Sequence, residues 1–211
     1  RYSGKLDSDA DEFIGFAVDG AKRMQSLING LLLYSRAGRQ DDAYETIDAS
    51  DVVNEAVMNL GSRIDAAGAT VNCDDLPSVV ADRAQLISIF QNLISNSIKY
   101  RSPTRDALVE VSAQRTRSAW EFKVKDNGIG IDSAFSDRIF TIFQRLHARD
   151  EYQGTGIGLA VVKKIVERTG GTIRLESKLD EGSSFIFTVI DRTIEVDSSE
   201  EDGRNVKRAA S

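Results

Sequence analysis

The apolar residues of this chain change their spacing along the sequence, and this change limits the folds that it can form. From Asp7 to about Ala37 they recur every three or four positions, which predicts one long amphipathic helix that Ser8 or Asp7 caps and Gly38 closes. Three consecutive leucines at 31–33 make the apolar stripe broad. A stripe of this width needs a partner helix.

Helical and alternating segments follow one another in the rest of the chain. Helical spacing covers residues 50–67, 82–100 and 157–168, and Asp82 with Gln85 resembles a capping box at the start of the second of these helices. Alternating apolar residues predict a short strand at 70–73 and two antiparallel hairpins, 107–115 with 120–126 and 172–177 with 184–190. This order predicts an α+β fold, a two-layer sandwich with the helices on one face of the sheet.

The chain divides into three parts by composition. The polar run GRQDDAYET at 38–46 predicts a linker, so we expect a helical segment at 1–40 and a mixed domain at 41–192. Residues 193–211 carry charge without periodicity and predict a disordered tail.

Composition excludes several classes of protein. A single Cys (Cys73) and a single His (His147) exclude a disulfide framework and a Cys/His zinc site. The net charge of −6 gives no electrostatic reason to expect nucleic acid as a partner. The longest apolar stretch, SLINGLLLYS, is far shorter than the roughly 20 residues of a membrane span. Because the chain begins at Arg1, we expect it to be a fragment of a longer protein.

The segment QNLISNSIKY places three polar side chains on one helix face. Asn92, Asn96 and Lys99 stand at i, i+4 and i+7. An Asn oxygen suits a Mg²⁺ ion that phosphates and water hold, and a Lys supplies a charge for those phosphates. A solvated polar face would give the same pattern.

The segment DNGIG follows a predicted strand, so Asp126 should stand at a strand end facing a pocket. Its carboxylate could accept from an exocyclic amine, and Gly128 and Gly130 would let a ligand approach the backbone. An ordinary turn explains the same residues.

The segment GTGIGLA leads into a predicted helix, whose N-terminal N–H groups would face an anion. It lacks the spacing of a P-loop and of a dinucleotide-binding fingerprint. Phosphate binding remains the natural use of its glycines.

Between the glycine segments, RIFTIFQRLHARDEYQ predicts a short helix with Phe140 and Phe143 packed inward and basic residues outward. Such a helix could act as a lid whose Arg approaches a phosphate. A small surface helix is the alternative, and His147 is more typical of an exposed surface group than of a catalytic one.

Taken together, these segments stand in the order of the N, G1, F and G2 boxes of sensor histidine kinases. The chain from Ile139 to Val189 resembles the kinases attached to bacterial phytochromes in particular, and AKRMQSLINGLLLYSR resembles the second helix of their dimerisation and phosphotransfer hairpin. The resemblance implies the GHKL type of ATP-binding fold, with a mixed, largely antiparallel sheet.

The resemblance also implies a set of ATP-binding residues. Asn96 would hold Mg²⁺, Lys99 would approach the phosphates, and Asp126 would recognise the adenine amino group. The catalytic residues would be Asn92, Lys99 and Arg145. The nucleotide would bind to Asn96, Lys99, Tyr100, Asp126, Gly128, Gly130, Ile131, Phe140, Phe143, Gly154, Thr155, Gly156, Ile157, Gly158 and Leu159.

Two departures from the family pattern matter. The phosphoacceptor His of the family would precede Arg1, and His147 would lie in the lid, so we expect this chain to bind ATP without phosphorylating itself on His. At Asn92, related ATPases of the gyrase, Hsp90 and MutL group carry a Glu that activates water. A carboxamide is a poor base, so ATP hydrolysis should be slow.

The sequence therefore predicts the catalytic domain of a histidine kinase, cytoplasmic, dimeric through its first helix, with ATP, Mg²⁺ and a response regulator receiver domain as partners. A membrane tether in a preceding segment stays open. One alternative is a degenerate kinase that binds ATP as an interaction module, and another is an ATP-hydrolysing machine of the gyrase type.

Overall fold

The computed structural model describes residues 8–37, 43–144 and 154–191. In these ranges the helices are α1 (Ser8–Arg36), α2 (Ala49–Ala67), α3 (Arg83–Lys99) and α4 (Gly158–Arg168). The strands are β1 (Tyr44–Asp48), β2 (Thr70–Cys73), β3 (Ser78–Asp82), β4 (Leu108–Arg115), β5 (Ala119–Asp126), β6 (Ile173–Lys178) and β7 (Gly182–Ile190). The four long helices and the two hairpins that were predicted are confirmed, whereas the linker prediction is wrong from Tyr44 onward, because β1 begins there.

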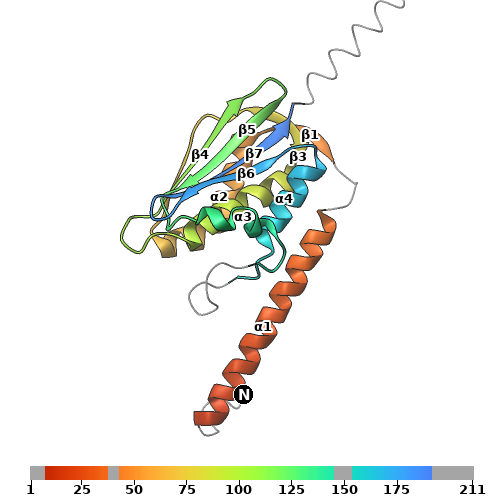
Figure 1. The fold of residues 1–211 in the computed structure, drawn as a ribbon. Coiled ribbons are helices and arrows are strands. Elements are labelled where there is room, and N and C mark those ends of the chain that lie inside the picture. The colour runs from red at the N-terminus through yellow and green to blue at the C-terminus, as the bar shows by residue number, and fades with distance from the viewer. Residues whose placement is uncertain (1–7, 38–42, 145–153, 192–211) are drawn as a thin grey trace, which may run out of the picture.

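Five strands form the main sheet in the order β2-β4-β5-β7-β6. Strand β2 is parallel to β4, and the other neighbours are antiparallel. Helices α2, α3 and α4 cover one face of this sheet (Figure 1). The α+β sandwich with a mixed, largely antiparallel sheet is therefore confirmed.

Strands β1 and β3 form a separate antiparallel pair that the sequence analysis missed. Each leads directly into a helix, and the last residue of each strand caps that helix. The Asp48 carboxylate accepts from the Ser50 N–H, and the Asp82 carboxylate accepts from the Gln85 N–H. The pair thus sets the starting points of α2 and α3.

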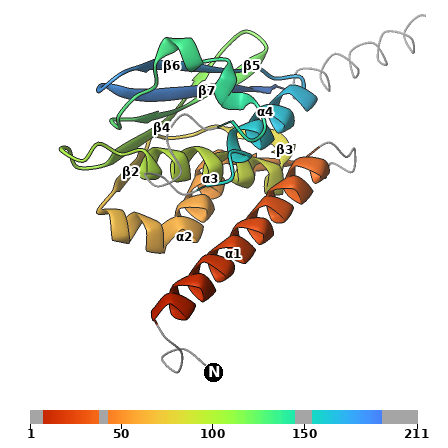
Figure 2. The same cartoon turned by 60° about the horizontal axis from the view of Figure 1, so that its bottom comes forward.

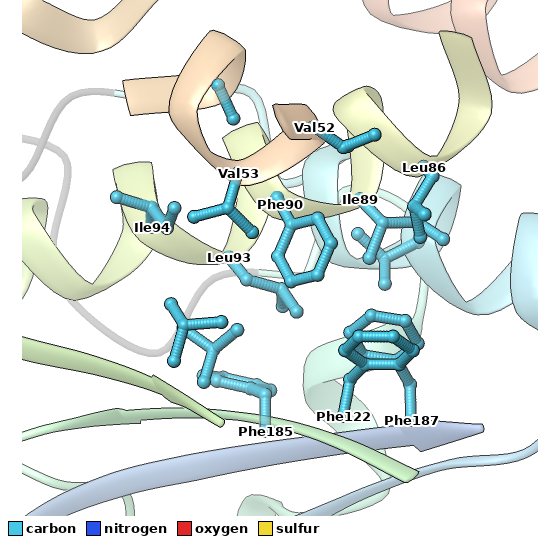
Figure 3. Packing of buried hydrophobic residues seen from close by; sticks show 14 of the residues in the cluster. Val52, Val53, Leu86, Ile89, Phe90, Leu93, Ile94, Phe122, Phe185 and Phe187 are labelled. Carbon is cyan, nitrogen blue, oxygen red and sulfur yellow. The ribbon is translucent and has the colours of Figure 1, made fainter. Parts of the chain in front are cut away.

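The core lies between the helices and the main sheet. Figure 3 shows Phe90 of α3 facing Phe122 and Phe187 of the sheet. The ring centroids of Phe122 and Phe187 are 5.4 Å apart in a stacked arrangement, and Phe90 meets both rings edge-on. Leu93 and Ile94, one turn further along α3, are also fully buried. This packing fixes the position of α3, whose C-terminal end reaches the site described below.

Helix α1 projects away from the sandwich, and the C-terminal part of α1 contacts α4 (Figure 2). A Cβ added at Gly30 would lie 2.7 Å from Ile157 Cδ1, and the Lys164 Nζ lies 4.0 Å from the centroid of the Tyr34 ring. Much of the apolar stripe of α1 remains exposed, including Phe13, Ile14, Phe16, Met24, Ile28, Leu31, Leu32 and Leu33. Within the described residues, no helix has the length and apolar character needed to cross a membrane.

Candidate functional site

A cavity opens where the C-terminal end of α3 meets the end of β5 and the start of β7. Its lining is mostly apolar and comes from segments far apart in the sequence. It consists of Asn96, Tyr100, Asp126, Ile129, Gly130, Ile131, Ile139, Gln144, Leu159, Ser183 and Phe185. An apolar cavity with a few polar groups is typical of a small-molecule site.

Asp126 is a carboxylate in this lining that the surrounding chain almost encloses, with 8% of its surface exposed. The sheet register pairs it with Ser183, whose N–H donates to Asp126 Oδ1 at 3.1 Å. The Gly128 N–H donates to the same oxygen at 2.9 Å, and the Ser97 hydroxyl donates to Oδ2 at 3.1 Å. The prediction that Asp126 stands at a strand end facing a pocket is confirmed.

Burial raises the pKa of Asp126 above its ordinary value, because the ionised form loses hydration. The hydrogen bonds from Gly128, Ser97 and Ser183 oppose this rise by stabilising the ionised form. Such a buried carboxylate in a cavity is a strong candidate for ligand recognition.

The polar face of α3 lies along the second glycine segment. A Cβ at Gly158 would lie 2.5 Å from Asn92 Oδ1, and a Cβ at Gly154 would lie 2.8 Å from Lys99 Nζ. Asn96, between them, lines the cavity. Lys99 also donates to the Tyr100 hydroxyl at 2.7 Å. The stripe therefore adjoins the cavity through Asn96 and the second glycine segment through Asn92 and Lys99.

Helix α4 begins at Gly158, beside this wall. Its N-cap residue, Ile157, makes no side-chain capping hydrogen bond, and Ile157 itself is buried. Leu159, in the first turn, lines the cavity. An anion bound at this end of the helix would meet backbone N–H groups and the positive end of the helix dipole.

The first glycine segment, DNGIG, packs closely against the backbone at Tyr100 and at Lys178. A Cβ at Gly128 would lie 2.4 Å from the Tyr100 carbonyl oxygen, and one at Gly130 would lie 2.0 Å from the Lys178 carbonyl oxygen. Gly130 also has a φ of 71°, which other residues adopt at a cost. These glycines let three segments of the cavity wall meet closely.

The segment after η2, the single-turn 3-10 helix Arg138–Phe140, departs from the prediction of a short helix. Phe140 is partly buried against the core, as predicted, but Phe143 is 58% exposed. Phe143 adopts a φ of 64° and donates its N–H to the Gly156 carbonyl at 3.0 Å. This turn ends helical geometry, so the prediction that both rings pack inward is wrong for Phe143. Arg145 and His147 lie outside the described residues.

Six of the predicted site residues line the cavity: Asn96, Tyr100, Asp126, Gly130, Ile131 and Leu159. Thr155 and Gly156 belong to the neighbouring glycine segment and are absent from that lining. The sequence analysis missed the other lining residues, Ile129, Ile139, Gln144, Ser183 and Phe185, and it missed Ser97. One signal was available for Ser97, which interrupts the apolar stripe of α3.

The family model of the histidine kinase-, DNA gyrase B- and HSP90-like ATPases matches residues 81–193, more than half of the chain. The chain belongs to this family. The matched range contains every predicted site residue of this ATPase domain, together with Ser97 and Ser183.

Relatives of this ATPase domain include signalling proteins. Cyanobacterial phytochrome A from Nostoc sp. is 50% identical over 90% of the chain, and the match covers 25% of that relative. The methanogenesis regulatory histidine kinase FilI from Methanothrix harundinacea is 32% identical over 87% of the chain and 21% of its own length. The chain thus spans about a quarter of the length of these relatives.

The fold recurs in a solved complex of the histidine kinase ThkA with the response regulator protein TrrA. The match has a TM-score of 0.66 at 18% identity and covers 90% of this chain and 55% of that one. A match over 90% of the chain includes part of the sequence before the sandwich, whose first strand begins at residue 44.

The family is one of ATPases. The cavity combines the carboxylate acceptor of Asp126, apolar surface from residues such as Ile131 and Phe185, and the neutral side-chain oxygen of Asn96. Within the described residues, no group of three or more His, Cys, Asp or Glu side chains could hold a metal ion.

Proposed function

We propose that this chain is the ATP-binding catalytic part of a sensor histidine kinase. It binds ATP with Mg²⁺ and passes the γ-phosphoryl group to a His on a dimerisation helix, from which a response regulator Asp receives it. One observation carries the proposal: Asp126 and Asn96 line one cavity, and the Asn and Lys face of α3 continues from it beside the N-terminus of α4.

In this proposal each wall of the site has a separate task. Asp126 accepts from the adenine amine, and the start of α4 with Lys99 faces the phosphates. Asn96 would provide the protein oxygen for Mg²⁺, which neutralises charge on the phosphates when bound. The predicted contribution of Arg145 to the same charge stays part of the proposal.

Asn92 helps to distinguish transfer to His from hydrolysis. During transfer, the bond between the γ-phosphorus and its bridging oxygen breaks, a bond to an imidazole nitrogen forms, and ADP leaves. A Cβ at Gly158 would meet the carboxamide of Asn92, which is a poor base and would not activate a water molecule for attack. Positioning and charge neutralisation then supply most of the rate enhancement.

Phosphoryl transfer is tested on the whole protein that contains this chain. With γ-labelled ATP and Mg²⁺, it should acquire a phosphoryl group that is labile in acid and stable in base. The Asp126→Asn variant of the same protein serves as the control and should stay unlabelled. ATP binding without any labelling would instead favour the interaction module, and fast steady release of phosphate would favour a gyrase-type ATPase.

The same proposal includes a homodimer through α1. The stripe from Phe13 to Leu33 is exposed along one helix, and such a surface is unfavourable in water. Above micromolar concentration, light scattering should give the mass of two chains of 23.2 kDa each. Ile28→Glu together with Leu31→Glu should give monomers, whereas Gln25→Glu, on an exposed polar position of the same helix, should not. A monomeric wild-type chain would contradict this part.

We also propose that the partner of the kinase is a response regulator receiver domain and that the reaction takes place in the cytoplasm, with no role for nucleic acid. The complex of ThkA with TrrA, whose kinase shares this fold, supports the choice of partner. The net charge of −6 supports the exclusion of nucleic acid.

A further inference from the structure

Ser97 is a buried hydroxyl that touches the carboxylate of the cavity from behind the wall. It follows Asn96 on α3 and is 3% exposed. Its Oγ lies 3.1 Å from Asp126 Oδ2 and 3.2 Å from the Leu93 carbonyl oxygen. A Ser hydroxyl has one hydrogen, so it donates to one of these acceptors at a time.

The acceptor positions of Asp126 can be counted. Oδ1 receives two backbone N–H groups, from Gly128 and Ser183, and each carboxylate oxygen has two lone pairs. Oδ2 receives the Ser97 hydroxyl, and the described residues offer this carboxylate no further hydrogen bond. One lone pair of Oδ2 therefore remains for a ligand in the cavity.

We propose that Ser97 is a positioning residue for Asp126: its hydroxyl holds the carboxylate as a pure acceptor toward the cavity, so that the site selects a purine with an amino group at C6. The inference rests on the proposed ATP site. The hydrogen bond from Ser97 is charge-assisted when Asp126 is ionised, which favours the acceptor form over a protonated form that could donate. It also restricts rotation of the carboxylate, which directs the remaining lone pair.

The pH dependence follows from the groups around Asp126. Burial raises its pKa, and the bonds from Gly128, Ser97 and Ser183 lower it. Strand β7 carries no ionisable side chain. Ionisable side chains on the other neighbouring segments include Lys99, Tyr100, Arg105, Glu110, Lys125 and Lys178. Loss of the Ser97 hydroxyl removes one of the hydrogen bonds that lower the pKa of Asp126, so this pKa should rise further.

The test compares Ser97→Ala with the wild-type 211-residue chain. Calorimetry with Mg²⁺ measures the affinities for ATP and for purine riboside triphosphate, which has no C6 amino group. In Ser97→Ala the affinity for ATP should fall about tenfold, the size of one hydrogen bond to a charged group. The affinity for the analogue should stay within about twofold, since it makes no amine contact.

The matched control is Ser95→Ala, two residues away on the same helix. The Ser95 hydroxyl accepts from Arg63 at 2.9 Å and has no contact with Asp126. This variant should keep the wild-type ratio of the two affinities. Lowering the pH through the pKa of Asp126 should remove the preference for ATP, and this loss should begin at a higher pH in Ser97→Ala.

The ratio of affinities separates positioning from a structural effect, because both ligands report on the same folded molecules. An unchanged ratio in Ser97→Ala, or an equal loss for both ligands, would overturn the inference while leaving the ATP site in place. If the wild-type chain itself binds ATP no better than the analogue, the recognition of adenine by Asp126 fails, and this inference fails with it.

Discussion

Asp126→Asn should abolish measurable ATP binding while the chain remains folded. The amide oxygen can still accept from the Gly128 and Ser183 N–H groups, which places the NH₂ group where Oδ2 now stands. The Ser97 hydroxyl can turn to donate to the Leu93 carbonyl and accept from this group, but the adenine amine would then face a donor in place of its acceptor. The lost charge-assisted hydrogen bond and the unpaired donor left in its place each cost about 1–3 kcal/mol, so binding weakens by a hundredfold or more, a loss that calorimetry with Mg²⁺ and ATP detects.

The control for this change is Asp132→Asn, an exposed carboxylate in the segment that follows the cavity wall. Its role is to accept from the Ala134 N–H, which an Asn oxygen can also do. ATP affinity should be unchanged there. Thermal unfolding should show that both variants are folded, and wild-type affinity in a folded Asp126→Asn variant would disprove our assignment of the site.

Phe122→Ala should lower the free energy of unfolding by about 3–5 kcal/mol. Phe122 is 0% exposed and lies between Phe90 of α3 and Phe187 of β7, so truncation leaves a cavity where sheet and helix layers meet. A domain of this size is stable by only about 5–15 kcal/mol. Urea denaturation, followed by circular dichroism, would show the midpoint shifted to much lower urea.

Phe143→Ala is the matched control, because it removes the same ring from a position that is 58% exposed. Its free energy of unfolding should change by less than about 1 kcal/mol. Similar losses for the two variants would mean that the triad of Phe90, Phe122 and Phe187 is not the centre of the core.

The helices and hairpins could be predicted because their signals are local. Asp82 stands three residues before Gln85, and their hydrogen bond needs no distant segment. The shared face of Asn92, Asn96 and Lys99 likewise follows from the 3.6-residue period alone. In each case the residues that interact are within a few positions of one another.

Strands β1 and β3 were not predictable by the same means. Each has five residues, and their partners are thirty positions away or more, from Asp48 with Ser78 to Tyr44 with Asp82. The polar run at 38–46 overlaps the start of β1, so no change of composition indicates where this strand begins. Strands of five residues also have too few positions for a clear alternation of apolar and polar residues. Phe143 was missed for a related reason, because its turn depends on a hydrogen bond to Gly156.

By itself, the amino-acid sequence determined the four α-helices, the strands β2 and β4 to β7, and which polar residues share the face of α3, because these depend on short-range periodicity. Only the tertiary structure decided the environment of Asp126. The strand register brings Ser183 to it, and the packing of α3 on the sheet brings Ser97 to its second oxygen. A carboxylate becomes a selective acceptor through its burial and its hydrogen-bond donors, and here these donors come from three segments that lie up to 57 positions from Asp126 in the sequence.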